Sequence, residues 1–430
     1  MKRIFIMNLI AGIFFLSACD KNEEKQNSQP IANAGIDKNT GINVLVQLDG
    51  SASSDSDNDI LTYAWQIISK PSGSITILSD PTHVNPSFTT DMKGSYKIIL
   101  IVSDGKADSN PDTIVIVASQ VITFNDTNLE TAIREEIDKE NGNIYAADLE
   151  ELTSLIATQK NIVDLSGLEY CINITELELW GNKIVDISAI GNLLQLEHLN
   201  LGSAEFGGYY GNEINDITPL AELYNLKWLS FIQNDIQNLT PLKNLTNLEY
   251  LSIRQNNISD ISQLENLTNL KTLDMNDNII ADGLSVLTNL INLEHLEFAR
   301  NNTSDISALE NLTKLKYQLD IGGNNISDIS ALSNLNELED LHIGENLIND
   351  ISPLSNLVSL QDVDLSYNQI IDISPLQDCS NNGGLFSGSF VNITFNNMDI
   401  TTGTSNLIVI TELINKGVSV DYEGGNITNK

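Results

Sequence analysis

One pattern, Leu-x-Leu-x-x-Asn-x-Ile-x-Asp-Ile, recurs along the chain and constrains its fold more than any other feature. Successive copies lie 22 or 23 residues apart, with one longer step of 30 residues between Asn182 and Asn212. A repeat this short cannot bury its own apolar face, so neighbouring copies must stack into a solenoid with one continuous core. The asparagine of the pattern is Asn182, Asn212, Asn234, Asn256, Asn278, Asn301, Asn324, Asn346 and Asn368.

Each copy predicts one coil of the solenoid. Leu273 and Met275 form a short strand with both side chains pointing into the core. The chain then turns at Asn278, whose amide we expect to satisfy backbone groups that the tight turn leaves unpaired. An earlier coil at Lys160 and a later one at Asn396 bring the total to about eleven. With strands about 4.8 Å apart, the coils predict a parallel sheet of roughly 50 Å.

The convex half of each coil carries apolar residues and short turns. In four coils a Ser or Thr precedes Pro, as in Ser352-Pro353, which predicts a capping residue at the start of a helical turn. Cys171 and Cys379 occupy the convex position that Leu267 holds in another coil, so we expect both to be buried. Roughly 40 Å of stacked strands separates them, too far for a disulfide.

The 22-residue period with Asp-Ile-Ser-Pro-Leu resembles the repeat of the internalin family of bacterial surface proteins. The resemblance implies a leucine-rich-repeat solenoid over residues 153–398, a helical N-terminal cap over residues 120–152 and a closing cap over residues 399–430. It also implies that the protein recognises or adheres to other proteins.

The residues of the N-terminal cap themselves favour a helix. Apolar residues at helical spacing, from Leu129 to Ile137, predict one buried face. We expect Asp126 or Thr127 to cap its start, with Glu130 at the capping-box offset from Thr127. The Gly of Asn141-Gly142 is expected to end the helix.

Residues 30–119 predict an all-β sandwich, so the chain is multidomain. Asp49-Gly50-Ser51-Ala52-Ser53-Ser54-Asp55, Tyr63-Ala64-Trp65 and Val102-Ser103-Asp104-Gly105 resemble motifs of the PKD family of Ig-like domains. The resemblance implies that Trp65 lies in the core between the two sheets. The expected strands are short alternating segments within residues 44–48, 61–67, 95–102 and 113–117.

The loops of this β domain contain a candidate Ca²⁺ site. Asp55-Ser56-Asp57-Asn58-Asp59 is not an EF-hand loop, because Ile60 replaces the required Gly. Some PKD-like domains hold Ca²⁺ with acidic residues in such loops, which makes Asp55, Asp57 and Asp104 candidate ligands. The alternative is a solvated acidic turn, and no other cofactor is expected.

The N-terminus predicts an exported lipoprotein. Lys2 and Arg3 precede an apolar run that ends at Leu16, which is typical of a signal peptide over residues 1–18. Leu16-Ser17-Ala18-Cys19 resembles a bacterial lipobox and implies acylation of Cys19. The polar residues 19–29 then form a tether. We expect the protein to be anchored in the cell envelope, at the outer membrane. A surface-exposed orientation is one option for the anchored protein.

The net charge of the chain limits the classes of partner that we expect it to bind. With 58 acidic and 22 basic residues, the formal net charge is −36. Nucleic acids and anionic lipid surfaces both require basic protein surface, so neither is expected as a partner. Past residue 16 no apolar run is long enough to span a bilayer, so the predicted membrane contact is the lipid alone. We expect a monomer.

The side chains that the repeat leaves free line the concave face, and solvent-facing aromatic rings there are typical binding anchors. The longer step in the repeat is an insertion, Gly202 to Gly211, with three aromatic residues. In the alternative interpretation this insertion packs on itself and covers the rings. Further along, the free positions are mainly acidic. The predicted ligand patch is Trp180, His198, Phe206, Tyr209, Tyr210, Trp228, Tyr250 and Arg254.

The sequence bears on three functional classes: an enzyme, a protein-binding surface protein and a carbohydrate-directed one. No Gly-x-Ser-x-Gly, His-Glu-x-x-His or phosphate loop occurs, so an enzyme is not expected. His295 and His342 lie two coils apart, roughly 10 Å, which disfavours a shared metal. The prediction is a non-enzymatic surface binding or adhesion protein with a protein ligand. The alternative is a carbohydrate-directed surface protein, since PKD-like domains accompany polysaccharide-degrading enzymes and aromatic rings can stack on sugars.

Overall fold

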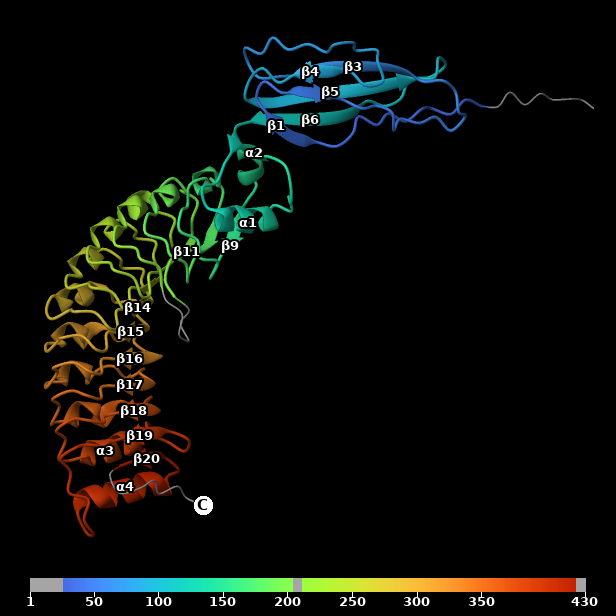
Figure 1. The fold of residues 1–430 in the computed structure, drawn as a ribbon. Coiled ribbons are helices and arrows are strands. Elements are labelled where there is room, and N and C mark those ends of the chain that lie inside the picture. The colour runs from blue at the N-terminus through green and yellow to red at the C-terminus, as the bar shows by residue number, and fades with distance from the viewer. Residues whose placement is uncertain (1–25, 204–210, 423–430) are drawn as a thin grey trace, which may run out of the picture. The chain divides into compact units, whose positions relative to one another are not determined.

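The computed structural model describes residues 26–203 and 211–422 (Figure 1). The chain divides into two compact units, residues 1–119 and 120–430. The signal, the lipobox with Cys19, and the insertion residues Phe206, Tyr209 and Tyr210 lie outside the described residues.

The first unit is a β-sandwich, as predicted. A four-stranded sheet in the order β1-β6-β5-β3 packs against the antiparallel pair β2–β4. Val46 and Phe88 of the pair share a core with Trp65, Tyr96 and Ile98 of the larger sheet. Trp65 is 4% exposed, which confirms its predicted place in the core. The strands are β1 Lys38–Gly41, β2 Leu45–Gln47, β3 Thr62–Ser69, β4 Ser87–Thr89, β5 Gly94–Ser103 and β6 Asp112–Ser119.

Two of these strands were not predicted. β1 has the sequence Lys-Asn-Thr-Gly, without apolar alternation, and pairs in parallel with β6 at the edge of the sheet. β4 has only three residues. Both are therefore held by their neighbours and not by local propensity.

The second unit is a solenoid around a parallel sheet of 12 strands, running without interruption from β9 to β20. Register is kept from coil to coil: Leu199 lies opposite Leu229, which lies opposite Leu251. β9–β19 come from the eleven coils and β20 from the closing segment. The strands are β9 Ser154–Ile156, β10 Glu176–Glu178, β11 His198–Asn200, β12 Trp228–Ser230, β13 Tyr250–Ser252, β14 Thr272–Asp274, β15 His295–Glu297, β16 Gln318–Asp320, β17 Asp340–His342, β18 Asp362–Asp364, β19 Phe390–Asn392 and β20 Ser419–Asp421.

Short 3-10 turns form the outer, convex side of the solenoid, opposite the strands (Figure 1). The predicted Ser or Thr cap is wrong. In the coil of Ser352-Pro353 the N-cap is Ile351, and Asp350 Oδ1 accepts the N–H of Ser352 at 2.8 Å. The Asp of the Asp-Ile pair therefore starts the turn. The turns are η1 Leu168–Tyr170, η2 Ser188–Ile190, η3 Thr218–Glu222, η4 Thr240–Leu242, η5 Ser262–Leu264, η6 Leu284–Asn289, η7 Ser307–Asn311, η8 Ser330–Leu332 and η9 Ser352–Asn356, with helix α3 Ser374–Asn382 in the tenth position.

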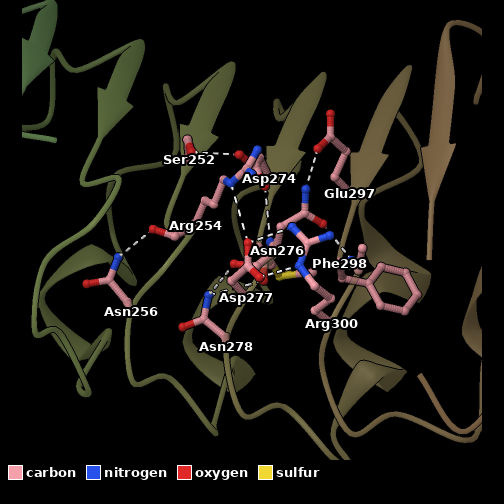
Figure 2. Close-up of polar contacts among 12 residues, drawn as sticks. Ser252, Arg254, Asn256, Asp274, Asn276, Asp277, Asn278, Glu297, Phe298 and Arg300 are labelled. Atoms are coloured by element: carbon pink, nitrogen blue, oxygen red, sulfur yellow. Dashed lines mark hydrogen bonds and ion pairs between the residues drawn. The ribbon is translucent and has the colours of Figure 1, made fainter. Parts of the chain in front are cut away.

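Buried asparagines join each coil to the one before it, as the sequence predicts. Asn256 Nδ2 donates to the carbonyls of Phe231, Ile253 and Arg254 at 3.0, 3.0 and 3.1 Å. Its Oδ1 accepts the N–H of Ile236 at 3.0 Å. One amide thus satisfies backbone groups in two successive coils. Figure 2 shows its bond to the Arg254 carbonyl.

Both ends of the solenoid are covered by helices. α1 Thr127–Glu136 begins at Asp126, whose Oδ1 accepts the N–H groups of Asn128 and Leu129. Glu130 forms an ion pair with Arg134 instead of a capping box, and the helix ends at Glu136, before the predicted Asn141. The other elements of the caps are β7 Val121–Ile122, β8 Ile144–Tyr145, α2 Ala146–Leu149 and α4 Ser405–Asn415.

The two cysteines of the solenoid, Cys171 and Cys379, are buried and unpaired, as predicted. Burial raises the pKa of each thiol to about 12, so neither is a reactive thiolate near neutral pH. No helix in the described residues is long and apolar enough to cross a membrane.

Candidate functional site on the concave face

Three rings stack on the concave face of adjacent strands. The register places His198 opposite Trp228 and Trp228 opposite Tyr250. The His198 and Trp228 ring centroids lie 4.1 Å apart with an angle of 10° between the planes. Trp228 and Tyr250 follow at 4.6 Å and 7°. We call these three residues the aromatic ladder.

In the aromatic ladder the two outer rings cover the faces of the middle ring, Trp228, and leave its edges exposed. Both faces of Trp228 are taken by its neighbours, and the ring is half-buried. His198 is held in place by Glu178, with Nε2 and Oε1 2.6 Å apart. Ring edges carry the positive end of the aromatic quadrupole, so they accept carbonyl oxygens and other rings edge-on. The ladder is therefore a rigid, flat strip of ring edges.

Arg254, which the sequence places in the ligand patch, belongs to a charged cluster beside the ladder. Its Nε lies 3.6 Å from Asp277 Oδ2. Arg300 reaches the same carboxylate, with Nη2 2.7 Å from Oδ2. Asp277 thus bridges two arginines from neighbouring coils, which restrains both (Figure 2).

Of two carboxylates at the centre of the concave face, Asp274 is buried and Glu297 is half-buried, although the sequence predicts solvent-facing side chains. Asp274 is 9% exposed and accepts from Ser252 Oγ at 3.0 Å (Figure 2). Burial, assisted by the charge of Glu297, raises the pKa of Asp274 to about 6. Burial also acts to raise the pKa of Glu297, but hydrogen bonds with His295 and Asn276 outweigh it and leave that pKa below its ordinary value.

The raised pKa of Asp274 predicts a pH-dependent stability. The folded state disfavours the ionised form, so the protein gains stability as pH falls from about 6 to about 4 and loses it as pH rises through that window. Asp274→Asn keeps the shape without the charge. It should stabilise the fold at pH 7.5 by on the order of 2 kcal/mol and have little effect at pH 4.

Urea unfolding of both proteins across this pH range measures the effect. Asp260→Asn is the matched control, because the hydrogen bond with Ser262 lowers the pKa of Asp260 and its removal should not stabilise the protein. Equal stability of wild type and Asp274→Asn at pH 7.5 would contradict the assigned burial cost.

The C-terminal half of the concave face is acidic, as predicted. The carboxylates of Asp320, Asp340, Asp362 and Asp364 project from β16, β17 and β18. Burial raises the pKa of Asp320 and, together with the charge of Asp362, that of Asp340. Among the described residues the only ion pair of this group is His342 with Asp362, at 4.0 Å. This half therefore complements a cationic surface.

A depression of about 530 Å³ adjoins the ladder at its N-terminal side. We call this hollow the N-terminal depression. Trp180 lines the N-terminal depression and is not one of the three residues of the aromatic ladder. The depression is lined by Ile156, Thr158, Glu176, Glu178, Trp180, Asn200, Ser203, Trp228, Ser230 and Ile232.

A larger depression, of about 690 Å³, follows the buried asparagines and is less suited to a ligand. Asn182, Asn212 and Asn234 line it, and their amide groups already bond to the backbone. Its polar floor belongs to the architecture of the coils.

The structure therefore brings His198, Trp228 and Tyr250 together from the predicted patch and places Trp180 and Arg254 on either side of them. Two features were missed. Ser230 is a concave hydroxyl hidden by its neighbours, and Tyr367 stacks on Phe395 with centroids 4.2 Å apart near the C-terminal end. Aromatic residues at equivalent positions of adjacent coils could have predicted the second.

The candidate Ca²⁺ ligands of the β domain meet the N-terminal segment. Asn27 Nδ2 donates to Asp104 Oδ2 at 2.8 Å, and the N–H of Ser28 donates to Asp57 Oδ2 at 2.7 Å. Asp55 Oδ2 and Asn27 Oδ1 are buried and have no hydrogen-bond partner within residues 26–203 and 211–422. Oxygen donors of this kind fit Ca²⁺. However, no three His, Cys, Asp or Glu side chains of the described residues converge to hold a metal, so the cage is not assembled.

The Ca²⁺ site thus stays a prediction with a direct measurement. If these oxygens close on a cation, millimolar Ca²⁺ should raise the melting temperature of the intact protein, and Asp55→Asn should abolish the shift. An unchanged melting temperature would leave a solvated acidic turn.

Comparisons with known proteins agree with this architecture. The family model described as leucine-rich repeats (2 copies) matches residues 246–289, 291–334 and 336–378. A second model, the K319L-like PKD domain, matches residues 34–117. None of the curated protein sequences matches the chain.

Solved structures match the solenoid. An internalin of Listeria monocytogenes (inlF) is 30% identical, covering 70% of this chain and 91% of that chain with a TM-score of 0.58. The functional domain of InlJ from the same organism is 21% identical, over 71% of this chain and 62% of that one, with a TM-score of 0.53. A leucine-rich-repeat protein of Leptospira interrogans is 20% identical, over 64% and 73%, with a TM-score of 0.51.

The fold and its open concave sheet define a leucine-rich-repeat protein, a class that presents an extended concave surface for binding. Within that class, the identity and coverage shared with the Listeria protein show that the chain belongs to the internalin family, with a PKD domain at its N-terminal side.

Proposed function

We propose that this chain is a non-enzymatic binding protein whose concave face recognises a protein partner. The observation that carries the proposal is the aromatic ladder of His198, Trp228 and Tyr250. Rigid aromatic side chains on an open sheet are typical centres of protein–protein interfaces, where a few such residues supply most of the affinity.

The geometry of the ladder favours a protein over a glycan. A sugar ring stacks on an open aromatic face, but His198 and Tyr250 cover both faces of Trp228. Edges of stacked rings instead suit the carbonyls, rings and aliphatic side chains of a polypeptide. The acidic half of the face adds complementarity to a basic partner surface.

We further propose that the protein is exported and anchored through Cys19, with the PKD domain between the tether and the solenoid. The lipobox-like Leu16-Ser17-Ala18-Cys19 supports this. Several acyl chains on one residue give stable membrane attachment, whereas a single chain does not. Cys19→Ala should move the protein from the membrane fraction to the soluble fraction of the producing bacterium. Retention of this variant in the membrane would contradict lipid anchoring.

The class of the ligand can be tested before its identity is known. The protein, immobilised so that the concave face of its solenoid is accessible, should capture a ligand from the surface of intact host or neighbouring cells. Protease treatment of those cells should abolish the capture. Periodate oxidation, which destroys sugar rings, should leave it in place. Capture that survives protease and fails after periodate would overturn the protein-ligand proposal in favour of a glycan.

A further inference from the structure

The N-terminal depression contains a buried polar group that has no partner among the described residues. Ser230 is 1% exposed, and its Oγ makes no hydrogen bond with any of them. It lies between Asn200 and Ser252 on the concave side of β12 and lines the depression. An unsatisfied buried hydroxyl costs free energy, about 1–3 kcal/mol, so a ligand that donates or accepts there is favoured.

The walls of the depression combine flat apolar surface with carboxylates. Trp180, Ile156 and Ile232 supply the apolar part. Glu176 and Glu178 supply two acids, and no Lys or Arg occurs among the residues that line it.

One oxygen of each carboxylate already takes part in a hydrogen bond within the protein. Glu178 Oε1 pairs with His198 at 2.6 Å, and Glu176 Oε2 accepts from Ser154 at 3.2 Å. The other oxygen of each carboxylate makes no hydrogen bond with the described residues, and neither carboxylate is paired with a Lys or Arg among them. Two carboxylates beside indole rings favour a planar cation.

We propose that the N-terminal depression is a subsite for an arginine side chain of the partner. The guanidinium is planar and delocalised, so its faces can lie against the indole of Trp180 while its N–H groups donate to Glu176, Glu178 and Ser230. An ammonium is a strongly hydrated point charge and uses the flat wall less well. A neutral sugar leaves the two carboxylates without a counter-charge.

This inference rests on the proposed function, because it names the chemistry of a side chain that a protein partner would insert. It is also consistent with the acidic carboxylates further along the same face, which would meet other basic residues of that partner. The subsite and the partner can nevertheless be tested separately.

The three tryptophans of the chain make a direct experiment possible. Trp180 and Trp228 line the depression, whereas Trp65 lies in the core of the other unit and serves as an internal reference. Nuclear magnetic resonance of the full-length, Cys19→Ala protein with ¹⁵N-labelled indoles would be followed during titration with acetyl-Gly-Arg-Gly-amide. Matched peptides would carry Lys or citrulline, and methyl glucoside would represent sugars.

The arginine peptide should shift the Trp180 and Trp228 signals, with a dissociation constant in the millimolar range, and leave Trp65 unchanged. Citrulline, which has nearly the same shape without charge, should bind at least tenfold more weakly, and lysine should also bind more weakly. No shift with arginine, equal binding of citrulline, or binding of the glucoside alone would overturn the subsite.

Two variants test the assigned groups. Glu178→Gln should weaken arginine binding at least tenfold, whereas Glu249→Gln, outside the depression, should not. Ser230→Ala should weaken it without lowering the melting temperature, because the hydroxyl has no partner in the part of the chain that the structure describes. Unchanged arginine affinity in both variants would contradict the assignment. Failure of the subsite together with protease-sensitive capture would leave the proposed protein ligand intact.

Discussion

Asn256→Ala should lower the free energy of unfolding of the solenoid by about 2–4 kcal/mol. The amide makes four backbone hydrogen bonds in a buried turn, and alanine makes none of them. The N–H of Ile236 then has no acceptor, and water cannot replace the lost group at a 7% exposed position. Neighbouring coils share these bonds, so the loss propagates along the stack.

The adjacent residue provides a matched control. Asn257 is exposed, so Asn257→Ala should change stability by no more than about 0.5 kcal/mol. At neutral pH, Asn256→Asp should destabilise at least as much as Asn256→Ala, since a buried carboxylate accepts from Ile236 but faces three carbonyl oxygens without a proton to donate. Urea unfolding gives the free energies, and hydrogen exchange at the Ile236 amide locates the effect. Equal stability of the two alanine variants would show that the buried asparagines are dispensable.

The repeat made most of the solenoid predictable. A pattern that recurs in eleven coils averages out local ambiguity, which is why the inward Leu and the buried Asn of nine coils were predicted correctly. The β-sandwich followed from alternating strands, but β1 and β4 did not, because their pairing depends on neighbours distant in sequence.

The concave face was less predictable than the core. A concave position was expected to be open, yet Asp274 is buried because the side chains of the flanking coils close over it. The sheet is closely spaced, so whether a short side chain is exposed depends on the size of its neighbours on both sides. One repeat cannot supply that information.

The repeat pattern also could not predict that aromatic rings stack across its longer step of 30 residues. His198 and Trp228 are 30 residues apart, and they meet because β11 and β12 pair directly despite the longer step between them. Tyr367 and Phe395 meet in a different way. Both adopt a left-handed backbone, with φ of 53° and 56°, at a turn position that glycine fills in the coil of Gly323.

Loss of the aromatic ladder should remove most of the binding. Trp228→Ala or Tyr250→Ala deletes a rigid ring and the stacking of its neighbour, and truncation of such interface centres costs about 2 kcal/mol or more, which is roughly a 30-fold loss of affinity. The effect is expected mainly in the dissociation rate. Tyr224→Ala is the matched control, because Tyr224 is a 46% exposed tyrosine of the convex side whose ring takes no part in the ladder.

The central claim is tested most directly by titration calorimetry of the captured protein with wild type, Tyr250→Ala and Tyr224→Ala. The measurement gives the three dissociation constants, and equal melting temperatures of the three proteins would show that all are folded. We predict at least a 30-fold weaker constant for Tyr250→Ala and an unchanged one for Tyr224→Ala. Equal affinity of the Tyr250→Ala variant and the wild type would show that the ladder is architecture and that the partner binds elsewhere.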